Sequence, residues 1–162
     1  MEAESIVLPQ KLGKMLREKA EEMEYLPEDL GIEFMLKGLN KNIDPEDLVV
    51  HYRVLSEKYL TEARELLKKG DLVQASETFW GASALAVKSI GAKKGLKLEE
   101  HGGLWSFVNV LAMQSGDKDL TTFFHVANSL HRNFYEGEMK RETVEIAAEN
   151  IEKLVDKLRK IS

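Results

Sequence analysis

The 162-residue chain contains 43% hydrophobic and 31% charged residues, which favours one folded domain and excludes a disordered chain. The lack of cysteine excludes a disulfide scaffold, a zinc–thiolate site and a thiol nucleophile. The formal charge of −5 argues against broad binding to duplex DNA, which requires neutralised phosphates. The apolar runs are too short for a membrane span, and the first residues do not resemble a signal peptide. We therefore expect a cytoplasmic protein, and the abundant Lys and Glu favour a thermostable one.

Residues 1–42 are predicted to form an N-terminal extension. Ser5 to Leu8 are typical of a short extended segment, Pro9 suits the first position of a helix, and Pro27 opens a second helix. The arrangement resembles the ribbon-helix-helix DNA-binding motif, but residues 1–41 hold six Lys/Arg and nine Asp/Glu, so we expect no DNA reading. Two interpretations remain: an arm that pairs strands in a homodimer, or a helical hairpin packed on its own bundle.

Residues 43–162 are predicted to form an antiparallel up-and-down bundle of four to five helices, so the fold class is all-α. Asp44 and Pro45 begin a long helix, and Gly70 ends it. Asp71 and Gln74 form a capping-box pattern for the next helix, and the tight turn makes the two helices antiparallel. The predicted helices occupy residues 45–69, 72–94 and 101–114, then a range from about 117 to 136, and a last range around 144–158.

The helix that ends at residue 136 carries two stripes. A continuous apolar seam with a spacing of three and four residues consists of Leu120, Phe123, Ala127, Leu130 and Phe134. A second stripe beside it consists of Phe124, Asn128, His131 and Tyr135. An imidazole, an amide and a phenol on one strip could serve acid–base chemistry, tautomer selection and stacking on a base. The alternative is a structural polar network at a contact between helices or subunits.

The preceding helices add polar residues that could face this strip. Glu77 could orient the imidazole of His131, and Lys88 could meet a phosphate. Alternatively, Glu77 and Lys88 are solvated, while Trp80 fills the core beside Gly81, whose missing side chain lets a neighbouring helix or ring approach. No HxxxH or HExxH pattern occurs, so we predict no metal, and no cofactor.

Several of these residues also resemble a family signature. Asp71, the QASE of residues 74–77, the WGA of residues 80–82, Lys88 and the LHRNFYE of residues 130–136 resemble the archaeal PaREP family, first group, of the HEPN superfamily. The resemblance covers about residues 45–160 and implies a HEPN-like bundle, a homodimer, and association with a nucleotide or RNA. The predicted ligand-binding residues are Glu77, Lys88, Asn128, His131, Asn133, Tyr135 and Glu136.

HEPN ribonucleases carry an Arg, four to six intervening residues and a His. His131 matches the histidine, but Val126, His125 and Phe124 stand where the Arg should be. The charge of a phosphate in the transition state would therefore lack its fixed cation. We expect a non-catalytic homodimer that binds a nucleotide, RNA or a protein partner. The alternatives are a purely structural interaction module and a weak metal-independent ribonuclease with His131 as its catalytic residue.

Overall fold

The computed structural model describes residues 4–96, 98 and 101–161, and this part of the chain is all-α, as predicted. Its helices are α1 (Gln10–Met23), α2 (Pro27–Leu39), α3 (Pro45–Lys69), α4 (Leu72–Lys93), α5 (His101–Ser115), α6 (Asp119–Glu136) and α7 (Arg141–Ile161). Residues 4–9 have no regular secondary structure, so the extended segment forms no strand within the chain. Pro9 precedes the first helix instead of opening it.

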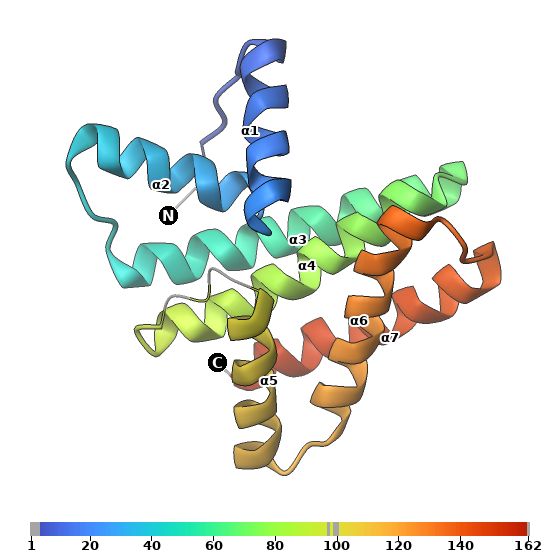
Figure 1. Cartoon of the computed structure of the whole chain (residues 1–162). Coiled ribbons are helices and arrows are strands. Elements are labelled where there is room, and N and C mark those ends of the chain that lie inside the picture. The colour runs from blue at the N-terminus through green and yellow to red at the C-terminus, as the bar shows by residue number, and fades with distance from the viewer. Residues whose placement is uncertain (1–3, 97, 99–100, 162) are drawn as a thin grey trace.

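The predicted capping residues set the bounds of the longest helices. The Asp44 carboxylate accepts a hydrogen bond from the Glu46 amide at the start of α3, and Gly70 ends that helix with a φ of 84°. The left-handed conformation is accessible to glycine without a steric cost, so the chain can reverse there. The Asp71 carboxylate then accepts from the Gln74 amide and caps α4. The two helices consequently run antiparallel (Figure 1).

Helix α4 is the centre of the bundle, and every residue from Phe79 to Ala92 is buried. Helices α3, α5, α6 and α7 all contact it (Figure 1). Its small residues permit close packing against α3, where the Ser56 hydroxyl donates to the Ala82 carbonyl at 2.7 Å. A Cβ added at Gly81 would lie 2.6 Å from the Tyr59 ring. The expectation that a ring closes in on Gly81 is therefore confirmed.

Helices α1 and α2 lie at a large angle to each other and project from the bundle, and we call residues 4–42 the arm (Figure 1). The arm is attached by two polar contacts near its bend. The Lys88 ammonium on α4 forms an ion pair with Asp29, and the Tyr59 hydroxyl on α3 donates to Glu28. Ala20 and Leu30 are the buried apolar residues of its helices. Among the described helices, none is long and apolar enough to span a membrane.

Candidate functional site

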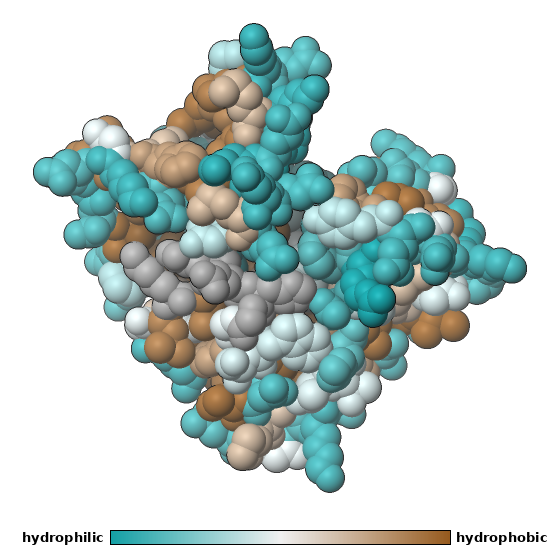
Figure 2. Space-filling view, in the orientation of Figure 1, coloured by the Kyte–Doolittle hydropathy of each residue, from teal (hydrophilic) through white to brown (hydrophobic). Residues whose placement is uncertain are grey.

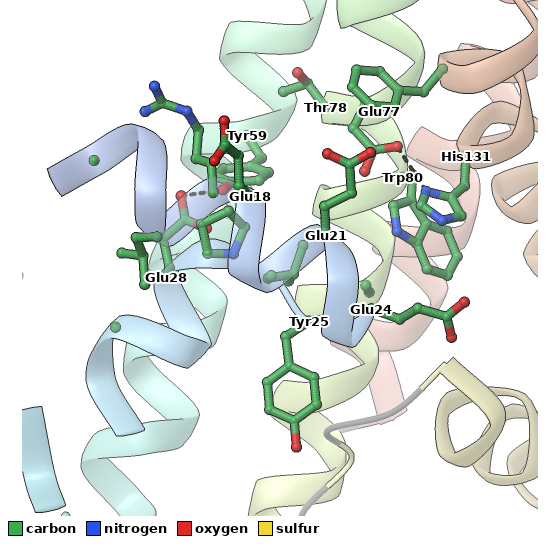
Figure 3. Close-up of a pocket in the computed structure, with 18 of the residues that line it drawn as sticks. Glu18, Glu21, Glu24, Tyr25, Glu28, Tyr59, Glu77, Thr78, Trp80 and His131 are labelled. Carbon is green, nitrogen blue, oxygen red and sulfur yellow. Dashed lines mark hydrogen bonds and ion pairs between the residues drawn. The ribbon is translucent and has the colours of Figure 1, made fainter. Parts of the chain in front are cut away.

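His131 of α6 and Glu77 of α4 form the polar centre of the candidate site (Figure 3). The imidazole Nδ1 lies 2.8 Å from the Glu77 carboxylate, as expected for a carboxylate that orients a histidine. The His131 ring lies between two aromatic rings, with its centroid 5.0 Å from that of Trp80 and 5.4 Å from that of Tyr135. The His131 side chain is 19% exposed. The imidazole is thus held in one orientation but not sealed off.

The site opens into a groove between the arm and the bundle, which we call the arm groove. Its volume is about 1060 Å³, and α1, α2, α3, α4, α5 and α6 all contribute to its lining. The cations in the lining are Lys14, Arg17 and Lys88. The carboxylates in the lining are Glu4, Glu18, Glu21, Glu24, Glu28, Glu62 and Glu77. The arm groove is consequently acidic, and Figure 3 shows Glu21 of the arm reaching towards Glu77 of the bundle.

The pKa shifts in the arm groove follow from burial and from this excess of carboxylates. Burial raises the pKa of Glu77 above its ordinary value, although the hydrogen bond and charge of His131 oppose the shift. The pKa of Tyr135 is also raised, first by desolvation and then by the carboxylates of Glu77, Glu21 and Glu24. Glu77 of the bundle and Glu21 and Glu24 of the arm therefore act on the same phenol, that of Tyr135.

Three of the predicted ligand-binding residues of α6 are not brought to the arm groove. Asn128 is half-buried and does not line it, and Glu136 forms an exposed ion pair with Arg132. Asn133 is 3% exposed and structural: its amide donates to the Ser76 hydroxyl, and its carbonyl oxygen accepts from the Met139 amide at 2.9 Å. Of the predicted stripe, only His131 and Tyr135 reach the site.

Phe124 also departs from the predicted stripe, because it is fully buried. Its ring contacts Trp80 at a centroid distance of 5.6 Å and Trp105 at 4.7 Å. Helix α6 packs against α4, α5 and α7, so it buries a wider arc than one apolar seam. Phe124 therefore belongs to the core and not to the candidate site.

The interpretation of Lys88 as a solvated residue is wrong, and its contact with a phosphate stays a prediction. Its side chain is 4% exposed, so it is not solvated, and its ammonium is paired with Asp29, so its charge is already neutralised. A phosphate in the arm groove would not meet a free cation at this position. The interpretation of Trp80 as a core residue is confirmed, because Trp80 is 5% exposed beside Gly81.

His125, at one of the positions where the HEPN pattern has its arginine, contacts α5. It is exposed, and its ring lies 4.5 Å from that of Trp105 on α5. It does not line the arm groove that His131 faces. Among the described residues, no group of three or more His, Asp or Glu side chains is arranged to hold a metal ion.

Sequence reasoning missed the contribution of the arm. The pattern that could have indicated it is a glutamate at every third position: Glu18, Glu21 and Glu24. All three line the arm groove together with Tyr25. The contact of Tyr59 with Glu28 links residues far apart in the chain, and no local pattern indicates it. Burial and the Glu28 carboxylate raise the pKa of Tyr59 far above its ordinary value, so the phenol stays a donor.

Comparison with known proteins places the bundle in a family. The model of the archaeal PaREP1/PaREP8 family matches residues 51–155. The chain belongs to this family. The matched segment contains α4, α5, α6 and most of α3 and α7, whereas the arm of this PaREP1/PaREP8 protein lies outside it.

A solved structure is similar to about two thirds of this chain. The crystal structure of a protein from Sulfolobus solfataricus is 27% identical in sequence, with a TM-score of 0.58. The match covers 65% of this chain and 93% of that chain. A search of curated proteins found no match.

Proposed function

We propose that this PaREP1/PaREP8 protein is a non-catalytic, HEPN-like accessory protein that acts as a homodimer assembled through the arm. Nine of the sixteen exposed large apolar side chains in the described residues lie between residues 6 and 39 (Figure 2). Six of these nine do not line the arm groove: Val7, Leu12, Met15, Met23, Phe34 and Leu39. A concentration of apolar surface on one projecting element favours a protein partner.

The distribution of charge along α1 is the observation that supports a second copy of this chain as the partner. The helix begins with Lys11 and Lys14 and ends with Glu21 and Glu22, and it has no acidic residue in its first turn and no basic residue in its last. This order opposes the helix dipole, so it destabilises an isolated helix. A second α1 in antiparallel orientation would place the acidic end of each helix beside the basic start of the other.

Such a contact has two-fold symmetry, because the same patch is used on both copies. The exposed apolar side chains of α1 would occupy its centre and the charged ones its rim. Lys14 and Glu18 also line the arm groove, so the dimer contact and the groove would share these two charged residues.

The charge of the arm groove weighs against a nucleotide or RNA ligand and against the ribonuclease alternative. A polyphosphate at His131 would occupy a groove lined by seven glutamates, while Lys88 is already paired with Asp29. Like charges at close range disfavour binding, and phosphoryl chemistry requires stabilised negative charge. We therefore favour the protein-binding form of the accessory function.

The mass of the full chain in solution tests the proposal. We expect the mass of two chains by light scattering, and the mass of one chain for Leu12→Glu/Met15→Glu. The matched control is Met113→Glu/Ile146→Glu, which adds the same charge on α5 and α7 at exposed apolar positions and should remain dimeric. A monomeric wild type, or equal behaviour of the two variants, would contradict the proposal.

Reversing the charges at one end of α1 tests whether the partner is a second copy of this chain or a different protein. Lys11→Glu/Lys14→Glu and Glu18→Lys/Glu22→Lys should each be monomeric, because each makes both ends of α1 the same sign. A mixture of the two variants should form a heterodimer, since one helix is then acidic and the other basic. Failure of the mixture to associate would refute the antiparallel pairing of α1.

A further inference from the structure

Lys88 is the one charged residue in the buried stretch of α4. Every residue from Phe79 to Ala92 is buried, and the others in this stretch are apolar, small or hydroxyl-bearing. Removing an ammonium group from water costs several kcal/mol, so a lysine at this position needs an anionic partner. In this structure the partner is Asp29 of the arm, and Lys88 also lines the arm groove. The bundle therefore holds a cation whose ion-pair partner is supplied by the arm.

The polar contacts that attach the arm are incompletely satisfied. One oxygen of Asp29 accepts from Lys88 and one oxygen of Glu28 accepts from Tyr59, but the other oxygen of each carboxylate is buried without a donor. Such oxygens are costly, and water would hydrate them if the arm moved away. A buried ion pair also adds little net stability, because the desolvation of both ions offsets their attraction. These contacts therefore specify where the arm docks more than they stabilise it there.

The arm can move as a unit. Residues 40–44, which form no helix, link α2 to α3, and Figure 1 shows α1 and α2 projecting from the bundle. The buried apolar residues of these two helices are Ala20 and Leu30. Segments with few buried apolar side chains open locally at a lower free energy than the whole protein unfolds. Rotation about residues 40–44 would then separate Asp29 from Lys88.

Release of the arm would change the charge beside His131. The arm contributes all of the carboxylates that line the arm groove except Glu62 and Glu77, and it contributes every lining cation except Lys88. Release would therefore remove five carboxylates and two cations from the surroundings of His131. Lys88 would remain on the bundle without its partner. An unpaired ammonium group binds charged oxygens by charge-assisted hydrogen bonds.

We propose that the arm is an autoinhibitory segment, in which the Asp29 carboxylate occupies the place of an oxyanion ligand at Lys88. The docked arm blocks this site, and an oxyanion that binds Lys88 favours the released arm, because the two compete for one ammonium group. The ligand carries a phosphate or a carboxylate, since both present charged oxygens as Asp29 does. The proposal does not depend on the homodimer, because Lys88 and Asp29 belong to one chain.

Hydrogen exchange of the full wild-type chain tests the competition. Inorganic phosphate at about twice its dissociation constant for the open site should accelerate the exchange of α2 amides about threefold, because it stabilises the released arm. The amides of α7 should not change. Sodium chloride at the same ionic strength should have a smaller effect, since salt screens buried ion pairs weakly. No acceleration by phosphate, or equal acceleration by both salts, would overturn the proposal.

Titration calorimetry of full-chain variants tests the site itself. Asp29→Asn preserves the shape of the side chain and should bind phosphate at least about tenfold more tightly than the wild type, because the arm no longer competes for Lys88. The matched control Asp47→Asn, at an exposed position of α3, should change the affinity less than about twofold. The double variant Asp29→Asn/Lys88→Met should lose the gain.

The outcomes of the calorimetry are distinct. Tighter binding of phosphate than of acetate by Asp29→Asn supports a phosphate-bearing ligand, and the reverse supports a carboxylate. Equal affinities of Asp29→Asn and Asp47→Asn would refute the competition, and phosphate binding that persists in the double variant would place the anion elsewhere. Circular dichroism confirms that each variant is folded, and hydrogen exchange of the wild type decides the question if Asp29→Asn is not.

Discussion

The replacement Lys88→Met tests how the arm is attached to the bundle. Lys88 and Asp29 are 4% and 9% exposed, and their ion pair joins α4 to α2. Methionine preserves most of the unbranched apolar stem but removes the ammonium. The Asp29 carboxylate would remain buried and charged, with neither oxygen hydrogen-bonded, because its Oδ1 atom already lacks a donor.

The expected cost is large because a buried charge loses its partner. Breaking one half of a buried ion pair destabilises proteins by about 3–5 kcal/mol. For a chain of this length, each kcal/mol lowers the melting temperature by about 2–4 °C, so the midpoint should fall by about 6–20 °C. The double variant Lys88→Met/Asp29→Leu should regain most of this loss, since an apolar pair of similar volume replaces the ion pair.

Urea denaturation, followed by tryptophan fluorescence, measures the free energies of unfolding. The control is Lys68→Met, at an exposed ion pair on α3, which should cost less than about 1 kcal/mol. Limited proteolysis shows whether the arm detaches before the bundle unfolds. The reasoning is refuted if Lys88→Met costs no more than Lys68→Met, or if the double variant is as unstable as the single one.

Three further substitutions test the bundle and the site by urea denaturation. Gly81→Ala should cost about 1–3 kcal/mol because its Cβ would collide with the Tyr59 ring, whereas Gly103→Ala on α5, with no atom within 4 Å, should stabilise by up to about 1 kcal/mol. Equal effects would contradict the close contact. Asn133→Ala should cost about 1–3 kcal/mol because it removes the hydrogen bonds of a buried amide to the Ser76 hydroxyl and the Met139 amide, and a loss below about 0.5 kcal/mol would argue against this role. Glu77→Gln removes a carboxyl group whose pKa is raised in the folded protein, so the folded state holds that proton more tightly than the unfolded state. The wild type should therefore gain free energy of unfolding relative to this variant as the pH falls through the raised pKa towards 4.5, and a pH-independent difference would exclude the shift.

Local signals predicted the helices of the bundle well. Asp44 and Pro45 begin α3, Gly70 ends it, and Gly137 ends α6 with a φ of 63°, all as expected from the sequence. These residues act on the backbone within one turn, so their effect does not depend on distant parts of the chain. The all-α fold class follows from the same signals.

The candidate site was only partly predictable, because its charges are set by contacts distant in sequence. The pairing of Glu77 with His131 joins two helices of the bundle and was one of the two interpretations of Glu77 that the sequence left open. The neutralisation of Lys88 depends on Asp29, which is fifty-nine positions earlier in the chain. No periodicity within either helix indicates that the arm bends back to this position. The acidity of the arm groove was missed for the same reason.

The division of residues between the family segment and the arm explains why the two parts suggest opposite ligands. Residues 51–155 contain Lys88 and His131, a cation and an imidazole that together suit an anion. The arm, outside that segment, supplies Asp29 to neutralise Lys88 and lines the groove with the α1 glutamates. The same bundle without the arm would lose these carboxylates and present Lys88 without its partner. The arm therefore makes the groove beside His131 acidic, although the cation and the imidazole of the family segment alone would suit an anion.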